Sequence, residues 1–134
     1  MLGFRFIEQK MIKSYKDLDV WKKSIELVKQ VYSLTQGFPK EEIYGLTSQM
    51  RRCAVSIPSN IAEGKTRQHV NEYIQFLYIG LGSCAELESQ VIIAKELGYL
   101  HNGSEIQIMQ QLDCIGRMFT NLIKGLREPR TQHL

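Results

Sequence analysis

The sequence predicts an all-α protein, an antiparallel up-down-up-down four-helix bundle. In four segments the apolar residues recur at spacings of three and four, which is typical of amphipathic helices. Short stretches with Gly, Pro or Asn-Gly separate these segments. Strand-like alternation and repeats of 20–50 residues are both missing from the sequence. Four such helices with short connections bury their apolar faces best as neighbours that run in opposite directions.

The first helix is expected to begin at Asp17 or Asp19, either of which can cap it, and to end before Gly37. One face of this segment is apolar, and the lysines fall outside that face. The residues predicted to form its core contact are Leu18, Trp21, Ile25, Val28 and Tyr32.

The second helix, within residues 46–67, carries its apolar face at Leu46, Met50, Cys53, Ile57 and Ile61. Pro58 lies inside it and has no N–H, so the bond to the carbonyl of Ala54 is lost and a kink costing about 3 kcal/mol is expected. Either Ser59 or Asn60 satisfies the freed backbone groups, or the helix breaks at Pro58 and restarts. Small residues along this helix favour close approach of another backbone. The polar run that includes Glu63 and Gly64 leads into a turn at 64–68.

The third helix is expected from about His69 to Leu97, where Gly98 suits the position after a helix end. Its core face reads Tyr73, Leu77, Leu81, Cys84, Leu87 or Glu88, Val91, Ala94 and Leu97. The fourth helix precedes Pro129, and its core face reads Ile108, Leu112, Ile115, Phe119, Leu122 and Leu126. The predicted organisation is a loosely ordered extension at 1–16, the bundle at 17–128 and a tail at 129–134.

Length and composition favour one soluble domain. The chain has 134 residues, of which 43% are hydrophobic, enough for a single core. We see neither an apolar run of the roughly 20 residues that span a bilayer nor a signal peptide, since charged residues interrupt the first ten positions. The sequence therefore predicts a cytoplasmic protein that does not enter a membrane.

Charge is segregated along the chain, although the net charge is only +3. Residues 47–67 carry four Lys and Arg against one Glu, whereas residues 68–100 carry one Lys against four Glu. With the turn near residue 66 or 67, Arg52 lies opposite residue 81, and Glu86 is roughly 8 Å further along the axis. One interpretation therefore pairs Arg51 or Arg52 with Glu86 as a structural contact, because a buried arginine needs a partner.

The other interpretation of the basic residues is contact with nucleic-acid phosphates. The ion pair is favoured for one of the two arginines. For the other arginine, together with Lys65 and Arg67, the structural and the phosphate interpretations are equally open. The candidates for nucleic-acid binding are Arg51, Arg52, Lys65, Arg67, Lys22 and Lys23.

Catalytic and metal-binding patterns are weak. Cys53, Cys84 and Cys114 are dispersed on three helices and are interpreted as small buried hydrophobic residues. His69, His101 and His133 lie near loops or the tail, away from the cysteines, and the glycines at 80–82 follow no strand. We therefore expect a protein that is not an enzyme and that holds no metal or cofactor.

Three segments carry a family resemblance: YKDLDVWKKSIEL, FPKEEIYGLTSQMRRCAVSIPSNIAEGKTR and GLGSCAELESQVIIAKELGYL. Across about residues 14–101 they resemble the bacterial four-helix-bundle proteins encoded in intervening sequences of 23S ribosomal RNA genes. The resemblance implies a ring-like homopentamer that binds or scaffolds RNA or other nucleic acid. The alternative that it implies is an adaptor whose ring docks an enzyme such as a reverse transcriptase.

Overall fold

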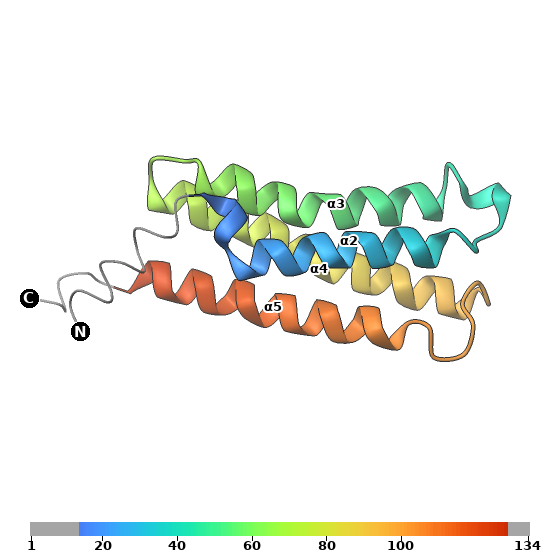
Figure 1. Cartoon of the computed structure of the whole chain (residues 1–134). Helices are drawn as coiled ribbons and strands as arrows, with labels where there is room; N and C mark the ends of the chain where they lie inside the picture. Colours follow the sequence, from blue (N-terminus) through green and yellow to red (C-terminus); the bar gives the residue numbers. More distant parts are fainter. Residues whose placement is uncertain (1–13, 129–134) are drawn as a thin grey trace, which may run out of the picture.

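Four helices form the molecule in the computed structural model, which describes residues 14–128. They are α2 (Asp19–Thr35), α3 (Leu46–Lys65), α4 (Val70–Glu96) and α5 (Ile106–Arg127), with short 3-10 turns η1 (Tyr15–Asp17) and η2 (Lys40–Glu42). The predicted all-α four-helix fold is confirmed, and residues 14–128 contain no strand. The colour gradient in Figure 1 shows that each helix runs antiparallel to the helix that precedes it in the chain.

Helices α3 and α5 bury the faces that their sequence patterns predict. Met50, Cys53, Ile57 and Ile61 of α3 are at most 6% exposed. Four of the six residues predicted for α5 are buried, and the last two are partly buried around Ile123, which lies in the core. In α4 most of the predicted face is buried, but Leu97 is 54% exposed beyond the helix end.

The predicted core face of α2 is wrong by about one residue. The buried positions are Val20, Ser24, Leu27, Val31 and Thr35, whereas Tyr32 is 41% exposed. Two of these buried residues are polar, so an apolar pattern does not reveal them. Their hydroxyls donate to backbone carbonyls one turn earlier, Ser24 to Val20 at 2.6 Å and Thr35 to Val31 at 2.8 Å, and this satisfies them in the core.

Helix α3 runs without a break through Pro58, so the alternative of a broken and restarted helix is wrong. Pro58 itself is buried. On the turn that contains it, Ser59 Oγ donates to the Val55 carbonyl at 2.8 Å and Asn60 Nδ2 to the Ser56 carbonyl at 2.7 Å. The carbonyl that loses its hydrogen bond because Pro58 has no N–H is that of Ala54. Ser59 and Asn60 bond to the two carbonyls that follow it, so they support the turn but do not replace the missing bond.

Glycine allows close contacts at two levels of the bundle. A Cβ on Gly80 of α4 would lie 2.7 Å from Cζ and 2.8 Å from Cε1 of Phe119. A Cβ on Gly64 at the end of α3 would lie 2.8 Å from Cβ of Phe76 and 2.9 Å from Cδ1 of Tyr73. The expectation that small residues permit close helix approach is therefore met at both positions.

The connections are held by specific side chains. Ser14 caps η1, and Tyr15 packs edge-on against Trp21 at 5.5 Å between ring centroids, so residues 14–16 of the predicted extension adjoin the bundle. Residues 1–13 of that extension and the predicted tail at 129–134 lie outside the described residues. At the far end of the bundle Glu42 accepts from the Leu46 N–H at 3.0 Å and from the Tyr99 hydroxyl at 2.7 Å. The α2–α3 connection is thereby tied to the end of α4.

Candidate functional site

Arg51 of α3 turns toward α2, and its predicted pairing with Glu86 is wrong. Its Nε donates to Thr35 Oγ1 at 2.8 Å, its Nη2 donates to the Tyr32 carbonyl at 3.4 Å, and its Cζ lies 4.6 Å from the centre of the Tyr32 ring. The neighbouring helix supplies neutral acceptors and an aromatic face in place of a carboxylate. The partner of this arginine is thus on a different neighbouring helix from the one that sequence reasoning considered.

Arg52 is exposed, and its predicted pairing with Glu86 is also wrong. Among residues 14–128 no hydrogen bond, ion pair or ring contact involves the Arg52 side chain. Glu86 is exposed and accepts a long bond of 3.5 Å from Gln90 Nε2. Within the described part of the chain, no ion pair joins the basic helix α3 to the acidic helix α4.

A groove lies between the C-terminal part of α2 and the N-terminal half of α3. We call it the arginine groove; it encloses about 520 Å³ and is lined by Tyr32, Ile43, Thr47, Ser48, Arg51, Arg52 and Val55. Both arginines that the sequence singled out face this one space. Sequence reasoning missed Tyr32, Thr47 and Ser48 as lining residues, because only the packing of α2 against α3 brings them together.

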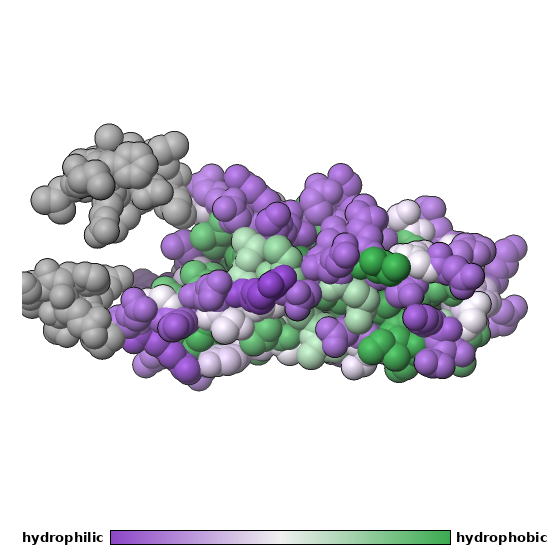
Figure 2. Space-filling model, turned by 90° about the horizontal axis from the view of Figure 1, so that it is seen from below, coloured by the Kyte–Doolittle hydropathy of each residue, from purple (hydrophilic) through white to green (hydrophobic). Residues whose placement is uncertain are grey.

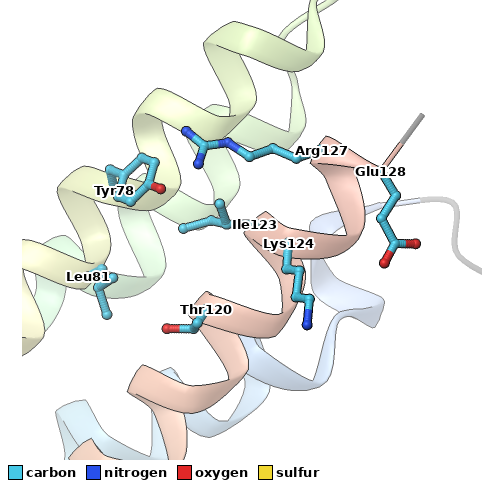
Figure 3. A pocket seen from close by; sticks show the side chains of 7 residues that line it. All are labelled: Tyr78, Leu81, Thr120, Ile123, Lys124, Arg127 and Glu128. Carbon is cyan, nitrogen blue, oxygen red and sulfur yellow. The ribbon is translucent and has the colours of Figure 1, made fainter.

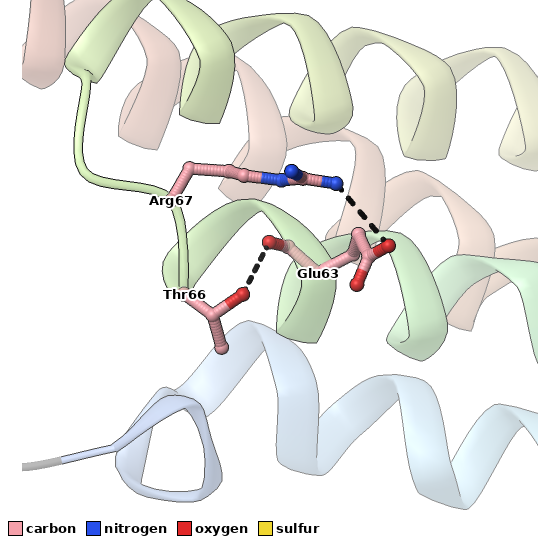
Figure 4. Close-up of polar contacts among 3 residues, drawn as sticks. All are labelled: Glu63, Thr66 and Arg67. Carbon is pink, nitrogen blue, oxygen red and sulfur yellow. Dashed lines mark hydrogen bonds and ion pairs between the residues drawn. The ribbon is translucent and has the colours of Figure 1, made fainter.

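Lys65 and Arg67 occupy the other end of α3. Lys65 Nζ lies 5.7 Å from the centre of the Tyr73 ring, and Arg67 Cζ lies 4.7 Å from that of Phe76. Arg67 also forms an exposed ion pair with Glu63 at 3.3 Å. Figure 4 shows this pair beside the bond of 2.8 Å from Thr66 Oγ1 to the Glu63 carbonyl. Glu63 therefore partly neutralises the positive charge of this turn.

The six residues predicted to bind nucleic acid do not form one patch. Lys65 lies thirteen positions after Arg52, which is about 20 Å along a helix. Lys23 lines a different groove, between α2 and α5, together with Glu26 and Gln107, and Lys22 is exposed on α2. Residues 14–128 contain 13 Lys and Arg and 13 Asp and Glu, so the described bundle has a net charge of zero. The described bundle of one copy therefore presents scattered cations rather than a basic surface.

Cys53 and Cys84 are poorly suited to act as thiolate nucleophiles. Cys53 donates to the Ser83 carbonyl at 3.1 Å, and burial, followed by the nearby Glu86 carboxylate, raises its pKa to about 12. Burial also raises the pKa of Cys84 to about 12. Both thiols thus stay protonated at neutral pH. Among residues 14–128 no three His, Cys, Asp or Glu side chains are grouped so that they could hold a metal ion.

The outward side of α4 is the largest feature that sequence reasoning missed. Tyr78, Ile79, Ile92, Ile93 and Leu97 are between 44% and 54% exposed, and Gly82, Ala85 and Ser89 lie exposed between them. We call these eight residues the outer face of α4; Leu97 follows the last residue of the helix, and the exposed carboxylates Glu86 and Glu96 lie on the same side of it. It makes α4 the one helix of residues 14–128 with the length and apolar composition to cross a membrane, although 39% of its most apolar window is buried in the bundle. Large apolar side chains that a helix exposes outside its buried face often mark a surface that a partner covers; the adjacent isoleucines at 92 and 93 were the sequence signal for this.

Among the hollows along the contact of α4 with α5, two enclose more than 400 Å³. One encloses about 410 Å³, and Figure 3 shows its lining side chains, with the Arg127 guanidinium reaching toward Tyr78; the Arg127 Cζ lies 5.2 Å from the ring centre. The other encloses about 420 Å³ and includes Ile92, Ile106 and Met109. Figure 2, viewed from below, shows hydrophobic side chains at the surface among the hydrophilic ones.

The fold and the surface together define a small helical-bundle protein with a groove that holds two arginines and an apolar helix face, and residues 14–128 contain no group of side chains that could hold a metal ion. Residues 16–121 match the family described as 23S rRNA-intervening sequence protein, so the chain belongs to that family. No curated protein matches the chain.

Proposed function

We propose that this chain is a non-enzymatic cytoplasmic protein that assembles into a homo-oligomer and in that form binds or scaffolds RNA or other nucleic acid. The observation that carries the assembly is the outer face of α4. Its five large apolar side chains are about half exposed in one copy, and covering them with a second copy removes this surface from water. Five copies is the number expected from the family resemblance.

Assembly also bears on nucleic-acid binding. A neutral bundle with scattered cations offers few phosphate contacts per copy, and the affinity of one copy is correspondingly low. An oligomer repeats each group of cations, and a strand that reaches several copies gains avidity without any new kind of contact. The binding is then salt-dependent and largely independent of sequence.

The assembly is tested by measuring the molar mass by light scattering for wild type, Ile79→Lys and Ile93→Lys. Both isoleucines are about half exposed, so the variants should fold, and we expect them to shift toward the monomer. Tyr44→Lys is the matched control, because Tyr44 is 95% exposed in the α2–α3 connection and should leave the assembly unchanged. A monomeric wild type, or lysine variants that assemble as wild type does, would refute this step.

Nucleic-acid binding is tested with a fluorescent single-stranded RNA of about 30 nucleotides, titrated at about 50 mM and about 200 mM salt. We expect binding by the oligomer at low salt that weakens steeply at high salt, and much weaker binding by Ile79→Lys. If the oligomer leaves the RNA unbound at low salt, this part of the proposal fails.

A second candidate function is an adaptor whose oligomer docks an enzyme such as a reverse transcriptase. The hollows beside α4 and α5 favour it, because they offer mixed apolar and charged lining of the kind that protein partners use. Recovery of the native assembly from cells, with identification of the bound protein and nucleic acid, separates the two functions.

A further inference from the structure

We propose that the arginine groove is a binding site for the phosphate group of a nucleotide, either free or within an RNA chain. This inference rests on the proposed nucleic-acid function and names one site for it among the scattered cations. It is carried by the donors that face the groove, by the lack of acidic groups in its lining and by its apolar walls.

Unused hydrogen-bond donors converge on this space. The Arg52 side chain has no hydrogen-bond or ion-pair partner among residues 14–128, so its whole guanidinium is free. Arg51 is fixed through Nε and Nη2, and its Nη1 has no partner within the described chain. An arginine that is already oriented loses less conformational freedom on binding, and a guanidinium matches the oxygens of a phosphate two at a time.

Thr47 is the second, independent observation. It is only 6% exposed, and its hydroxyl has no hydrogen-bond partner among residues 14–128. Two side-chain oxygens in this part of the chain are fully enclosed and have no partner, and they belong to Gln90 and Gln111. The Thr47 hydroxyl is not among them, so it keeps access to the groove that it lines. Ser48, one residue further, is half-buried and also lacks a partner there. A hydroxyl that opens onto the groove and has no partner among the described residues can donate to a phosphate oxygen placed there.

The electrostatic balance of the groove favours an anion. None of the seven residues that line it is acidic, and two are arginines. The nearest carboxylate along the chain, Glu42, is already engaged by the Leu46 N–H and the Tyr99 hydroxyl, so it does not neutralise them by direct contact. Two guanidinium groups and two hydroxyls suit the several oxygens of a phosphate better than the two of a carboxylate.

The walls indicate an organic phosphate rather than the inorganic ion. Ile43 is 56% exposed, Tyr32 is 41% exposed and Val55 is 40% exposed, and all three border the space that the arginines face. A sugar or base attached to the phosphate can lie against these apolar surfaces. A volume of about 520 Å³ is in the range of pockets that hold small organic ligands.

The test is calorimetric titration of the whole protein with adenosine monophosphate, with adenosine as the probe without phosphate. The variants are Arg52→Gln, Thr47→Val and the control Arg117→Gln, an exposed arginine of α5 that is paired with Asp113. We expect saturable binding of the monophosphate, weaker binding of adenosine, a loss of about tenfold or more in Arg52→Gln and no loss in the control. Arg52 has no structural partner within residues 14–128, so circular dichroism should show that Arg52→Gln folds as wild type does, even if Thr47→Val does not.

Each other outcome decides between the two proposals. One result would overturn the groove alone: the protein binds RNA, shows no saturable binding of the monophosphate, and binds RNA equally well as Arg52→Gln and as Arg117→Gln. The groove is then not the phosphate site, and the proposed function stands. Equal affinity for adenosine and the monophosphate would also overturn the assignment of the site. If the monophosphate binds and depends on Arg52 while RNA does not bind, the groove is upheld and the nucleic-acid function fails.

Discussion

Replacing Gly80 with alanine tests the close contact between α4 and Phe119 of α5. The new Cβ would meet two carbons of the Phe119 ring at 2.7 and 2.8 Å, and Phe119 is completely buried, so the ring must move into a packed core. Overpacking of this kind costs about 1–3 kcal/mol, while alanine gains about 1 kcal/mol over glycine in a helix. The difference of the two terms is about 0–2 kcal/mol, so we expect Gly80→Ala to lower the free energy of unfolding by up to about 2 kcal/mol.

The same substitution two residues away provides the matched control. A Cβ added to Gly82 would have no atom within 4 Å in one copy, where Gly82 is exposed, so Gly82→Ala should raise the stability of the single copy by about 0.5–1 kcal/mol through helix propensity. Urea unfolding followed by circular dichroism measures both, with light scattering to verify that the variants share one assembly state. If Gly80→Ala is as stable as Gly82→Ala, the argument from the Phe119 contact is refuted.

Three further predictions concern polar groups. Glu42→Gln should weaken the hydrogen bond that caps the Leu46 N–H. That hydrogen bond, followed by the one from the Tyr99 hydroxyl, lowers the pKa of Glu42 in the folded protein. The Glu42 carboxylate therefore contributes to stability above its unfolded pKa, and this contribution is lost as the pH falls through its folded pKa. The gap in urea midpoint between variant and wild type should therefore be present at neutral pH and should close as the pH falls through the lowered pKa of Glu42. Thr35→Val removes the acceptor of Arg51 Nε, and we expect the free energy of unfolding to fall by about 1–2 kcal/mol. Arg51→Ala should cost less in the Thr35→Val background than in wild type, because only its contacts with Tyr32 are left to lose there. Cys53 has a pKa of about 12 through burial, so iodoacetamide at about pH 8 should leave it unmodified in the native protein and modify it in urea; rapid native labelling would contradict this.

The sequence pattern was sufficient for the fold, because α3 and α5 concentrate apolar side chains such as Ile57 and Ile115 on one stripe each. It was misleading for α2, where the buried Ser24 and Thr35 satisfy themselves within their own helix and leave no apolar signal. The rotation of a helix about its axis is decided by such local bonds together with its neighbours, and Tyr32 lies at the surface as a result.

The candidate site was predicted less well, and Arg51 shows why. Its position on α3 follows from the sequence, but whether it faces α2 or α4 depends on the three-dimensional order of the helices around the core. The predicted pairing with Glu86 assumed that Arg51 faces α4, the helix that follows α3 in the chain. Thr47 could not be recognised at all from the sequence, because its significance lies in being buried without a partner among the described residues.

The packing of α2 against both α3 and α5 has a consequence for the order of folding. The contacts of α2 with α3, α3 with α4 and α4 with α5 join helices that are consecutive in the chain, and closing short loops is entropically cheap. The contact of α2 with α5 alone joins the first helix to the last and must wait until the other three have formed. We expect φ-values that are high at Ile57 in α3 and low on the side of α5 that faces α2, so that the bundle opens first along this side when it unfolds.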